Sequence, residues 1–596
     1  MSPLGASVLD DTVTFTVWAP RCRSVDVVVE GRRPEPMSRG DGSLFEATLG
    51  RVPAGARYHY RLDGARHRPD PASRWQPEGV HGASVVVDPR RFMWTDQDAR
   101  GVAPADLVIY ELHVGAFTPT GTFEAVIPHL PALADLGVTA LQLMPVAEFP
   151  GSRDWGYDGV HLWAPQSTYG GPRGLRRLVD ACHVRGLAVF LDVVYNHLGP
   201  EGNYLAEYGP YFTDRVKTPW GPAVNFDGEG SDGVRRHVVE NGRAWVRDFH
   251  LDGFRLDAVH AIHDASPTHI VTQFAAAVRD EAARAGRRVQ VVAESHDNDR
   301  RLVLPTTEGG LGLDAVWSDD FHHALHQRIT GETTGYYGDF AGSQHLPRAL
   351  TQGFAFQGET SKYWGRPRGT PSADLPAERF VIFVQNHDQV GNRPQGERLG
   401  SLVPFDAMKL AAGLMFAAPA VPLLFMGEEY GETAPFQFFT SFLDAGLAEA
   451  VRQGRAADVK RFGWTRAIPD PNAPNIFVSS RLNHPLALAT RHRALHQYYA
   501  RWLALRRTHP ALGARDKGLA RAELDASGAI LTLTRATGAG EEARLVANLG
   551  AVRRDWAPPA GAAWRLVLDS DDARFGGSGG ARPLAPYQLL LFDAAR

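Results

Sequence analysis

The sequence predicts an α/β protein: a (β/α)8 TIM barrel with an N-terminal β-sandwich domain and a C-terminal β-domain. Three observations lead to this fold. Eight apolar, strand-like runs recur between positions 107 and 426, and helical segments separate them. Short alternating runs fill the first 94 positions, and alternation returns after position 510. A chain of 596 residues has room for a large barrel and two smaller domains.

The N-terminal domain is expected over residues 1–96. Its runs TVTFTVWAP, SVDVVVEG, YHYRLDG and ASVVVDP are separated by closely spaced Gly, Pro and Asp. Alternation with a period of two puts every second side chain on one face of a strand. Several such short strands are typical of a β-sandwich.

The barrel is expected over residues 97–510. Its eight runs begin at Leu107, Ala140, Leu187, Gly253, Val289, Ala315, Arg379 and Val421. Buried parallel strands are continuous Val, Ile and Leu runs, and helices such as 123–136 and 174–185 alternate with them. A doubly wound sheet would alternate similarly, but polar residues end nearly every run, which favours a barrel. The long interval between the third and fourth runs predicts an inserted loop subdomain at about 199–229.

The C-terminal β-domain is expected over residues 511–596, after a long amphipathic helix at 492–509. The runs AILTLTRAT, EARLVANLG and YQLLLFD alternate as strands do. The most apolar stretch, 410–426, is too short to span a bilayer comfortably and contains two prolines. It is expected to be a buried helix leading into a strand.

Composition restricts the class of protein. Apolar residues at 44% and charged residues at 22% are typical of globular proteins. The net charge of −4, without a long basic run, argues against nucleic acid as a partner. Two cysteines, Cys22 and Cys182, make neither a disulfide framework nor a zinc site, and residues 1–19 lack the pattern of a signal peptide. We expect a cytoplasmic monomer with no cofactor and no membrane partner.

Four carboxylates end strand runs. Asp192, Asp257, Glu294 and Asp388 end the third, fourth, fifth and seventh runs. One acidic residue after a strand is most often a helix cap or a turn residue. Four of them at the same rim of a barrel indicate a functional site.

Two of these carboxylates differ in their expected surroundings. Arg255 and Asp257 are two apart on one strand, so their side chains point the same way, and the guanidinium favours the ionised carboxylate. Glu294 follows the apolar residues VVA and is the candidate for a protonated carboxyl. Two carboxyls with divergent pKa values are what glycosidic cleavage requires.

The motifs DVVYNH (192–197), GFRLDAVH (253–260), AES (293–295) and QNHD (385–388) resemble, in order, four signature regions of the α-amylase family of glycoside hydrolases. WGYD (155–158) is similar to a further family element. The resemblance implies a retaining α-glycoside hydrolase with Asp257 as nucleophile, Glu294 as general acid/base and Asp388 as the third carboxylate. It also implies that the sugar is bound by Tyr157, His197, Arg255, His260 and His387.

Longer segments, including WSDDFHHALH (317–326) and QNHDQVGNRPQGERL (385–399), resemble one branch of this family. That branch hydrolyses the α-1,4 bond next to a terminal α,α-1,1-linked glucose pair and releases trehalose. The resemblance favours substrate binding by Asp319, His322 and His323. We expect the loop after Asp388, with Gln389 and Asn392, to supply further partners for the sugar hydroxyls. Two alternatives remain open: a glucan branching enzyme with the same carboxylates, and a non-catalytic glycan-binding protein, although such relatives lose carboxylates that are present here.

Two local features also stay open at this point. His322 and His326 are four residues apart on one helix face, a spacing that could bind a metal or be ordinary helix surface. Trp220 could be a packing residue or a sugar platform. Many α-amylases bind calcium partly through a residue four positions after the nucleophile, and here that position is Ala261. We therefore predict no metal site.

Overall fold

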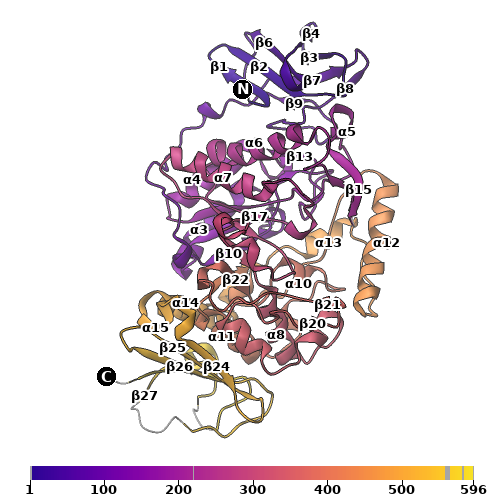
Figure 1. Ribbon diagram of the computed structural model, residues 1–596. Helices are drawn as coiled ribbons and strands as arrows, with labels where there is room; N and C mark the ends of the chain where they lie inside the picture. The colour runs from indigo at the N-terminus through magenta and orange to yellow at the C-terminus, as the bar shows by residue number, and fades with distance from the viewer. Residues whose placement is uncertain (1–2, 219, 558–563, 580–582, 595–596) are drawn as a thin grey trace.

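The computed structural model describes residues 3–218, 220–557, 564–579 and 583–594, and its centre is a closed barrel (Figure 1). The parallel strands follow one another in the order β10-β11-β14-β17-β18-β19-β22-β23. They are β10 (Ile109–Leu112), β11 (Ala140–Leu143), β14 (Ala188–Val193), β17 (Gly253–Leu256), β18 (Gln290–Ala293), β19 (Ala315–Trp317), β22 (Phe380–Phe383) and β23 (Val421–Phe425). Each predicted run contains one of these strands, so the barrel prediction is confirmed.

The two faces of the barrel strands explain why the runs are apolar throughout. Alternate residues, such as Phe190, Val292 and Phe383, belong to one buried cluster. The residues between them, such as Phe254, belong to a larger cluster with the surrounding helices, where Phe254 packs on Phe274 at 5.2 Å. Strands buried on both faces need apolar side chains on both.

Helices cover the outside of the barrel. They include α2 (Phe123–Val126), α3 (Leu130–Leu136), α4 (Gly171–His183), α6 (Ser231–Phe249), α7 (Ile270–Arg284), α8 (Asp319–Thr330), α9 (His345–Thr351) and α11 (Phe405–Ala417). The helix predicted at 123–136 is divided by a 3-10 turn, Ile127–His129, because Pro128 has no N–H for an α-helical bond. In the parts of the chain that the structure describes, no helix combines the length and apolarity needed to cross a bilayer.

The N-terminal domain is the predicted sandwich. One sheet has the order β1-β2-β6-β5 and the other β4-β3-β7-β8, with β9 paired to β7. These strands are β1 (Gly5–Leu9), β2 (Thr12–Trp18), β3 (Val25–Val29), β4 (Glu35–Pro36), β5 (Ser38–Arg39), β6 (Leu44–Gly50), β7 (Arg57–Leu62), β8 (Arg66–Arg68) and β9 (Ser84–Val85). Phe15 and Tyr58 are fully buried in it and make an edge contact at 4.9 Å.

The C-terminal sheet is antiparallel and lies beside a long helix, α14 (Thr490–Thr508) (Figure 1). Its order is β24-β25-β26-β28-β27. The strands are β24 (Ala520–Leu524), β25 (Ile530–Ala536), β26 (Glu542–Asn548), β27 (Trp564–Asp569) and β28 (Leu589–Ala594). A side chain at Gly413 of α11 would collide with Leu589 and Tyr498, so barrel helix, α14 and sheet meet closely there.

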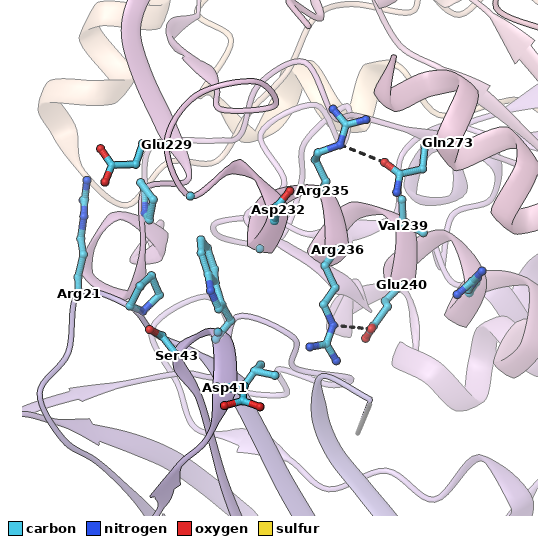
Figure 2. A pocket seen from close by; sticks show the side chains of 18 residues that line it. Arg21, Asp41, Ser43, Glu229, Asp232, Arg235, Arg236, Val239, Glu240 and Gln273 are labelled. Carbon is cyan, nitrogen blue, oxygen red and sulfur yellow. Dashed lines mark hydrogen bonds and ion pairs between the residues drawn. The ribbon is translucent and has the colours of Figure 1, made fainter. Parts of the chain in front are cut away.

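The predicted insertion after β14 holds a short helix, α5 (Leu205–Tyr208), and the hairpin β15 (Phe212–Thr218) and β16 (Gly221–Val224). A cavity of about 1120 Å³ lies between the sandwich and α6 (Figure 2). Some of its lining residues pair locally, as in the Arg236–Glu240 ion pair at 2.6 Å and the Arg235–Gln273 hydrogen bond at 3.0 Å. None of the described residues that line it is a predicted site residue.

A buried ion-pair network fastens the segment after the sandwich to the amino-terminal side of the barrel. His183 lies with Nδ1 2.7 Å from Asp96 and Nε2 2.8 Å from Asp252, which directly precedes β17. Both ring nitrogens donate to carboxylates, so the imidazole is cationic. Burial opposes this charge, but the two carboxylates raise the pKa of His183 to about 9. Arg287 bonds Asp252 at 2.9 Å.

Candidate active site

The predicted carboxylates lie at the carboxyl ends of the barrel strands. Asp192 is in β14, two residues after Phe190, and Glu294 follows β18, two residues after Val292. Because Phe190 and Val292 belong to the cluster formed by alternate strand residues, the strand period of two points both carboxyls toward the same mouth. Asp257 follows β17, and Asp388 is in a short helix, α10 (His387–Gly391), after β22.

Arg255 lies at the centre of these carboxylates. Its Nη1 bonds Asp192 Oδ2 at 2.6 Å and Asp257 Oδ1 at 3.0 Å. Its Nη2 lies 3.7 Å from Glu294 Oε2 and 3.9 Å from Asp388 Oδ2, beyond hydrogen-bonding distance. The guanidinium is fully buried above the ring of Trp317, at 4.2 Å. The Arg255 guanidinium is therefore hydrogen-bonded to Asp257, but it is only near the other two carboxyls, Glu294 and Asp388.

Asp257 is held as a carboxylate. Besides Arg255, Asn196 donates to its Oδ2 at 2.7 Å and to its backbone carbonyl at 2.8 Å. Donors to the charged form favour ionisation and fix the direction of the carboxylate. The arrangement suits a nucleophile.

Glu294 is held as an acid. Burial raises the pKa of Glu294 to about 8; Arg255 opposes the rise, and Asp257, Asp388 and Asp319 add to it. The backbone N–H of Ala258 donates to Glu294 Oε2 at 2.7 Å. Ala258 takes a left-handed conformation, with φ of 41°, an uncommon backbone region for alanine. This turn directs its N–H at the acid.

Tyr157 and His387 form one side of the site. Tyr157 donates to Asp192 at 2.7 Å, and His387 Nε2 donates to the Tyr157 oxygen at 2.8 Å. His387 Nδ1 donates to Glu111, the third residue of β10, at 2.7 Å. With both nitrogens donating, the ring is cationic. Burial opposes the charge, but Asp388 and Glu111 raise the pKa of His387 to about 9.

His197 and His260 lie at the rim. His197 is hydrogen-bonded to Asn196 and stacks on the ring of Trp220, with 4.7 Å between the ring centroids. Trp220 is 49% exposed to solvent. The indole of Trp220 is therefore an exposed aromatic group beside His197. His260 makes an edge contact with His296 at 4.1 Å.

Asp319 lies near the proposed acid, Glu294, and two amide side chains, Gln389 and Asn392, bond to the carboxylates of this region. Gln389 donates to Asp319 at 3.3 Å, and Asn392 donates to Asp388 at 3.1 Å. Burial raises the pKa of Asp319 to about 7; Arg368 opposes the rise, and Asp388 adds to it. The structure therefore brings these three predicted residues to the same mouth as the carboxylates.

His322 and His323 are placed differently from the expectation. His322 is 3% exposed; its Nδ1 donates to the Val384 carbonyl at 2.6 Å and its Nε2 accepts from Tyr337 at 2.9 Å. His323 is equally buried, 4.1 Å from the ring of Tyr336. Only the start of α8, at Asp319, faces the mouth, and these histidines lie further along the helix in the core. We do not propose either as a sugar-binding group.

Sequence reasoning missed Glu111, Asn196 and Arg455. Glu111 lies inside an apolar strand run, and a carboxylate at such a position is itself an indication of a buried polar contact. Asn196 is within the DVVYNH motif, but its uncharged side chain did not mark it as a partner of Asp257. Arg455 is on α12 (Ala445–Phe462), outside the regular barrel, and bonds Asn392 at 2.8 Å.

The barrel, with these carboxylates around one buried arginine, defines a glycoside hydrolase of the α-amylase class. The family model for the alpha amylase catalytic domain matches residues 86–218, and that for carbohydrate-binding module 48 (isoamylase N-terminal domain) matches 3–89. The chain belongs to the malto-oligosyltrehalose trehalohydrolase family. A protein of that name from Saccharolobus solfataricus is 50% identical over 451 residues, 76% of this chain and 79% of that one.

Two further similarities frame this assignment. The crystal structure of a candidate alpha amylase from Salmonella typhimurium is 37% identical, with a TM-score of 0.91 over 100% of both chains. A 1,4-alpha-glucan branching enzyme from Xanthomonas campestris is 28% identical over 71% of this chain and 60% of its own length. The similarity to the branching enzyme is therefore lower than that to the trehalohydrolase.

Proposed function

We propose that the protein hydrolyses the α-1,4-glucosidic bond next to the terminal trehalose unit of maltooligosyltrehalose, releasing trehalose and a maltooligosaccharide. The observation that carries this proposal is the asymmetry around Arg255. One carboxyl, Asp257, receives two side-chain donors, whereas the other, Glu294, is buried and protonated at neutral pH, with a pKa of about 8. The family to which the chain belongs supports the choice of substrate.

In the first step, Asp257 attacks the anomeric carbon while Glu294 gives its proton to the departing glycosidic oxygen. The C–O bond to trehalose breaks, a glycosyl ester forms on Asp257, and trehalose leaves as the neutral alcohol. In the second step, ionised Glu294 takes a proton from water, which attacks the same carbon. This releases Asp257 and restores the acid.

Asp388 is proposed to hold sugar hydroxyls as positive charge develops on the ring. The cationic His387 places a positive charge 3.5 Å from Asp388, and the ring of Tyr157 is proposed to offer a stacking face to the sugar. Charged groups fixed before the reaction stabilise a charged transition state without reorganising at that moment.

Specificity is proposed to come from Asp319, Gln389 and Asn392. A 1,1-linked pair is non-reducing and bent differently from a 1,4-linked chain, so its hydroxyls need partners in different places. Polar groups built for one hydroxyl pattern reject ligands that leave them unpaired, by up to ~10⁴-fold.

Product analysis tests this function. The protein is incubated with maltooligosyltrehalose, and products are separated by chromatography. We expect free trehalose and a maltooligosaccharide shorter by two glucose units. The Glu294→Gln variant, which keeps the shape but not the proton, should lose about 10²-fold or more in rate. New α-1,6 branches would instead assign a branching enzyme.

We also propose that the protein acts in the cytoplasm as a monomer. Cys22 and Cys182 are both buried free thiols, which fits a reducing compartment. Cell fractionation and sedimentation velocity test the two parts of this proposal separately.

A further inference from the structure

Asp388 is held less tightly than the other two proposed catalytic carboxylates. Its side chain is 42% exposed, against 12% for Asp257 and 15% for Glu294. Arg255 is 3.9 Å away and His387 3.5 Å away. The shortest polar contact of the Asp388 carboxylate is the 3.1 Å hydrogen bond that Asn392 donates to its Oδ1. The orientation of Asn392 therefore decides how Asp388 is held.

An asparagine amide can present either its oxygen or its NH2 group to a neighbour, and only the NH2 group can donate to a carboxylate. Asn392 Oδ1 accepts a 2.8 Å hydrogen bond from Arg455 Nη1. A guanidinium has donors and no acceptor, so it bonds only the amide oxygen. Arg455 therefore turns the NH2 group of Asn392 toward Asp388.

Arg455 reaches this point from outside the regular barrel. It lies on α12, which follows β23 and runs along one side of the molecule (Figure 1). Within this helix only Val459 is fully buried among the described residues. The Arg455 guanidinium lies 4.8 Å from the ring of Phe438, which makes an edge contact with Trp155 at 5.0 Å. The aromatic pair holds the cation at the rim of the site.

We propose that Arg455 is a positioning residue for Asp388, acting through the amide of Asn392. Without the guanidinium the amide is free to turn its oxygen toward the carboxylate, which would repel it. The titratable groups that face Asp388 are Arg255, His387, Glu294 and Asp319. Arg455 also interacts electrostatically with Asp388, so its removal takes a cation from these surroundings. The proposal rests on the proposed role of Asp388 in hydrolysis.

The test uses Arg455→Met, which keeps much of the aliphatic stem on Phe438 and removes every donor. We expect kcat/KM to fall about tenfold or more, since a hydrogen bond to a charged group is lost, with the larger share in kcat. Arg455→Lys, which keeps a cationic donor, should retain most of the wild-type kcat/KM. Arg452→Met, one turn earlier on α12 at an exposed position, is the control and should behave as the wild type.

Wild-type kinetics in Arg455→Met would overturn the proposal, as would equal losses of kcat/KM in Arg455→Met and Arg452→Met. A binding measurement keeps this test separate from the proposed function. In the Glu294→Gln background, calorimetry with maltohexaose should show weaker binding when Arg455→Met is added and no change with Arg452→Met. Equal binding in both double variants would refute the positioning role even if the enzyme's substrate were different.

Discussion

Arg255 Nη2 lies 3.7 Å from Glu294 Oε2, whereas Nη1 of the same guanidinium is hydrogen-bonded to Asp257 Oδ1 at 3.0 Å. A difference of this size separates a charged hydrogen bond from a mere proximity of charges. Asp257 is thereby stabilised as an anion, and Glu294 keeps its proton. Burial raises the pKa of Glu294, and Arg255 at this longer distance does not cancel that rise, so Glu294 is suited to be the acid.

The alkaline limb of the pH profile should report Glu294. Burial raises the pKa of Glu294 to about 8, and catalysis needs its protonated form, so kcat/KM should fall as pH rises through about 8. Asp319→Asn removes a negative neighbour that raises this pKa, so the limb should move to lower pH. Steady-state rates from pH 5 to 10 measure both. A limb that stays in place in Asp319→Asn would contradict this coupling.

The stereochemistry of the product should be retained. A covalent intermediate on Asp257 inverts the anomeric carbon twice, so the newly formed reducing end is α at first. Proton NMR within the first minutes of the reaction detects the anomer before mutarotation. The same mechanism requires the Asp257 and Glu294 carboxyls to lie about 5 to 5.5 Å apart. A β product would show that water attacks directly.

The His183 network should stabilise the fold in a pH-dependent way. The pKa of His183 is raised to about 9 in the folded state, so its contribution is complete below its ordinary value near 6.5 and is lost as pH rises through about 9. His183→Gln leaves Asp96 and Asp252 without their shared cation, at a cost of about 3 to 5 kcal/mol. Thermal melts should show a larger loss of Tm at pH 6 than at pH 10. An equal loss at both values would mean that packing, not charge, is responsible.

Removing metal ions should leave the protein unchanged. Ala261 occupies the position where many α-amylases place a calcium-binding residue, and within the described residues no group of three or more His, Cys, Asp and Glu is arranged to hold a metal. Dialysis against a chelator should preserve both rate and Tm. Loss of either, with recovery on adding calcium, would show a metal requirement.

The barrel was predictable because burial on both faces marks every strand as an apolar run. The carboxylates were predictable for a related reason: a charged residue directly after such a run has to lie at a strand end. The pairing of Arg255 with Asp257 followed from the period of two along the chain at the end of β17. These features are local in the sequence.

The positioning residues were not predictable in this way. Arg455 lies 63 residues from Asn392 on a helix with little burial, and nothing in its neighbourhood indicates a contact with Asn392. His322 shows the reverse case: its place in a polar motif indicated a site, but α8 places it in the core, where Tyr337 and a backbone carbonyl use both ring nitrogens. Such contacts depend on tertiary packing.

The central claim is tested most directly by comparing kcat/KM for maltooligosyltrehalose with that for a maltooligosaccharide of equal length. The account predicts a much higher value for maltooligosyltrehalose, with trehalose as the small product, and predicts that Asp319→Ala narrows the preference more than it slows hydrolysis of the plain chain. Equal values for the two substrates in the wild type would contradict it.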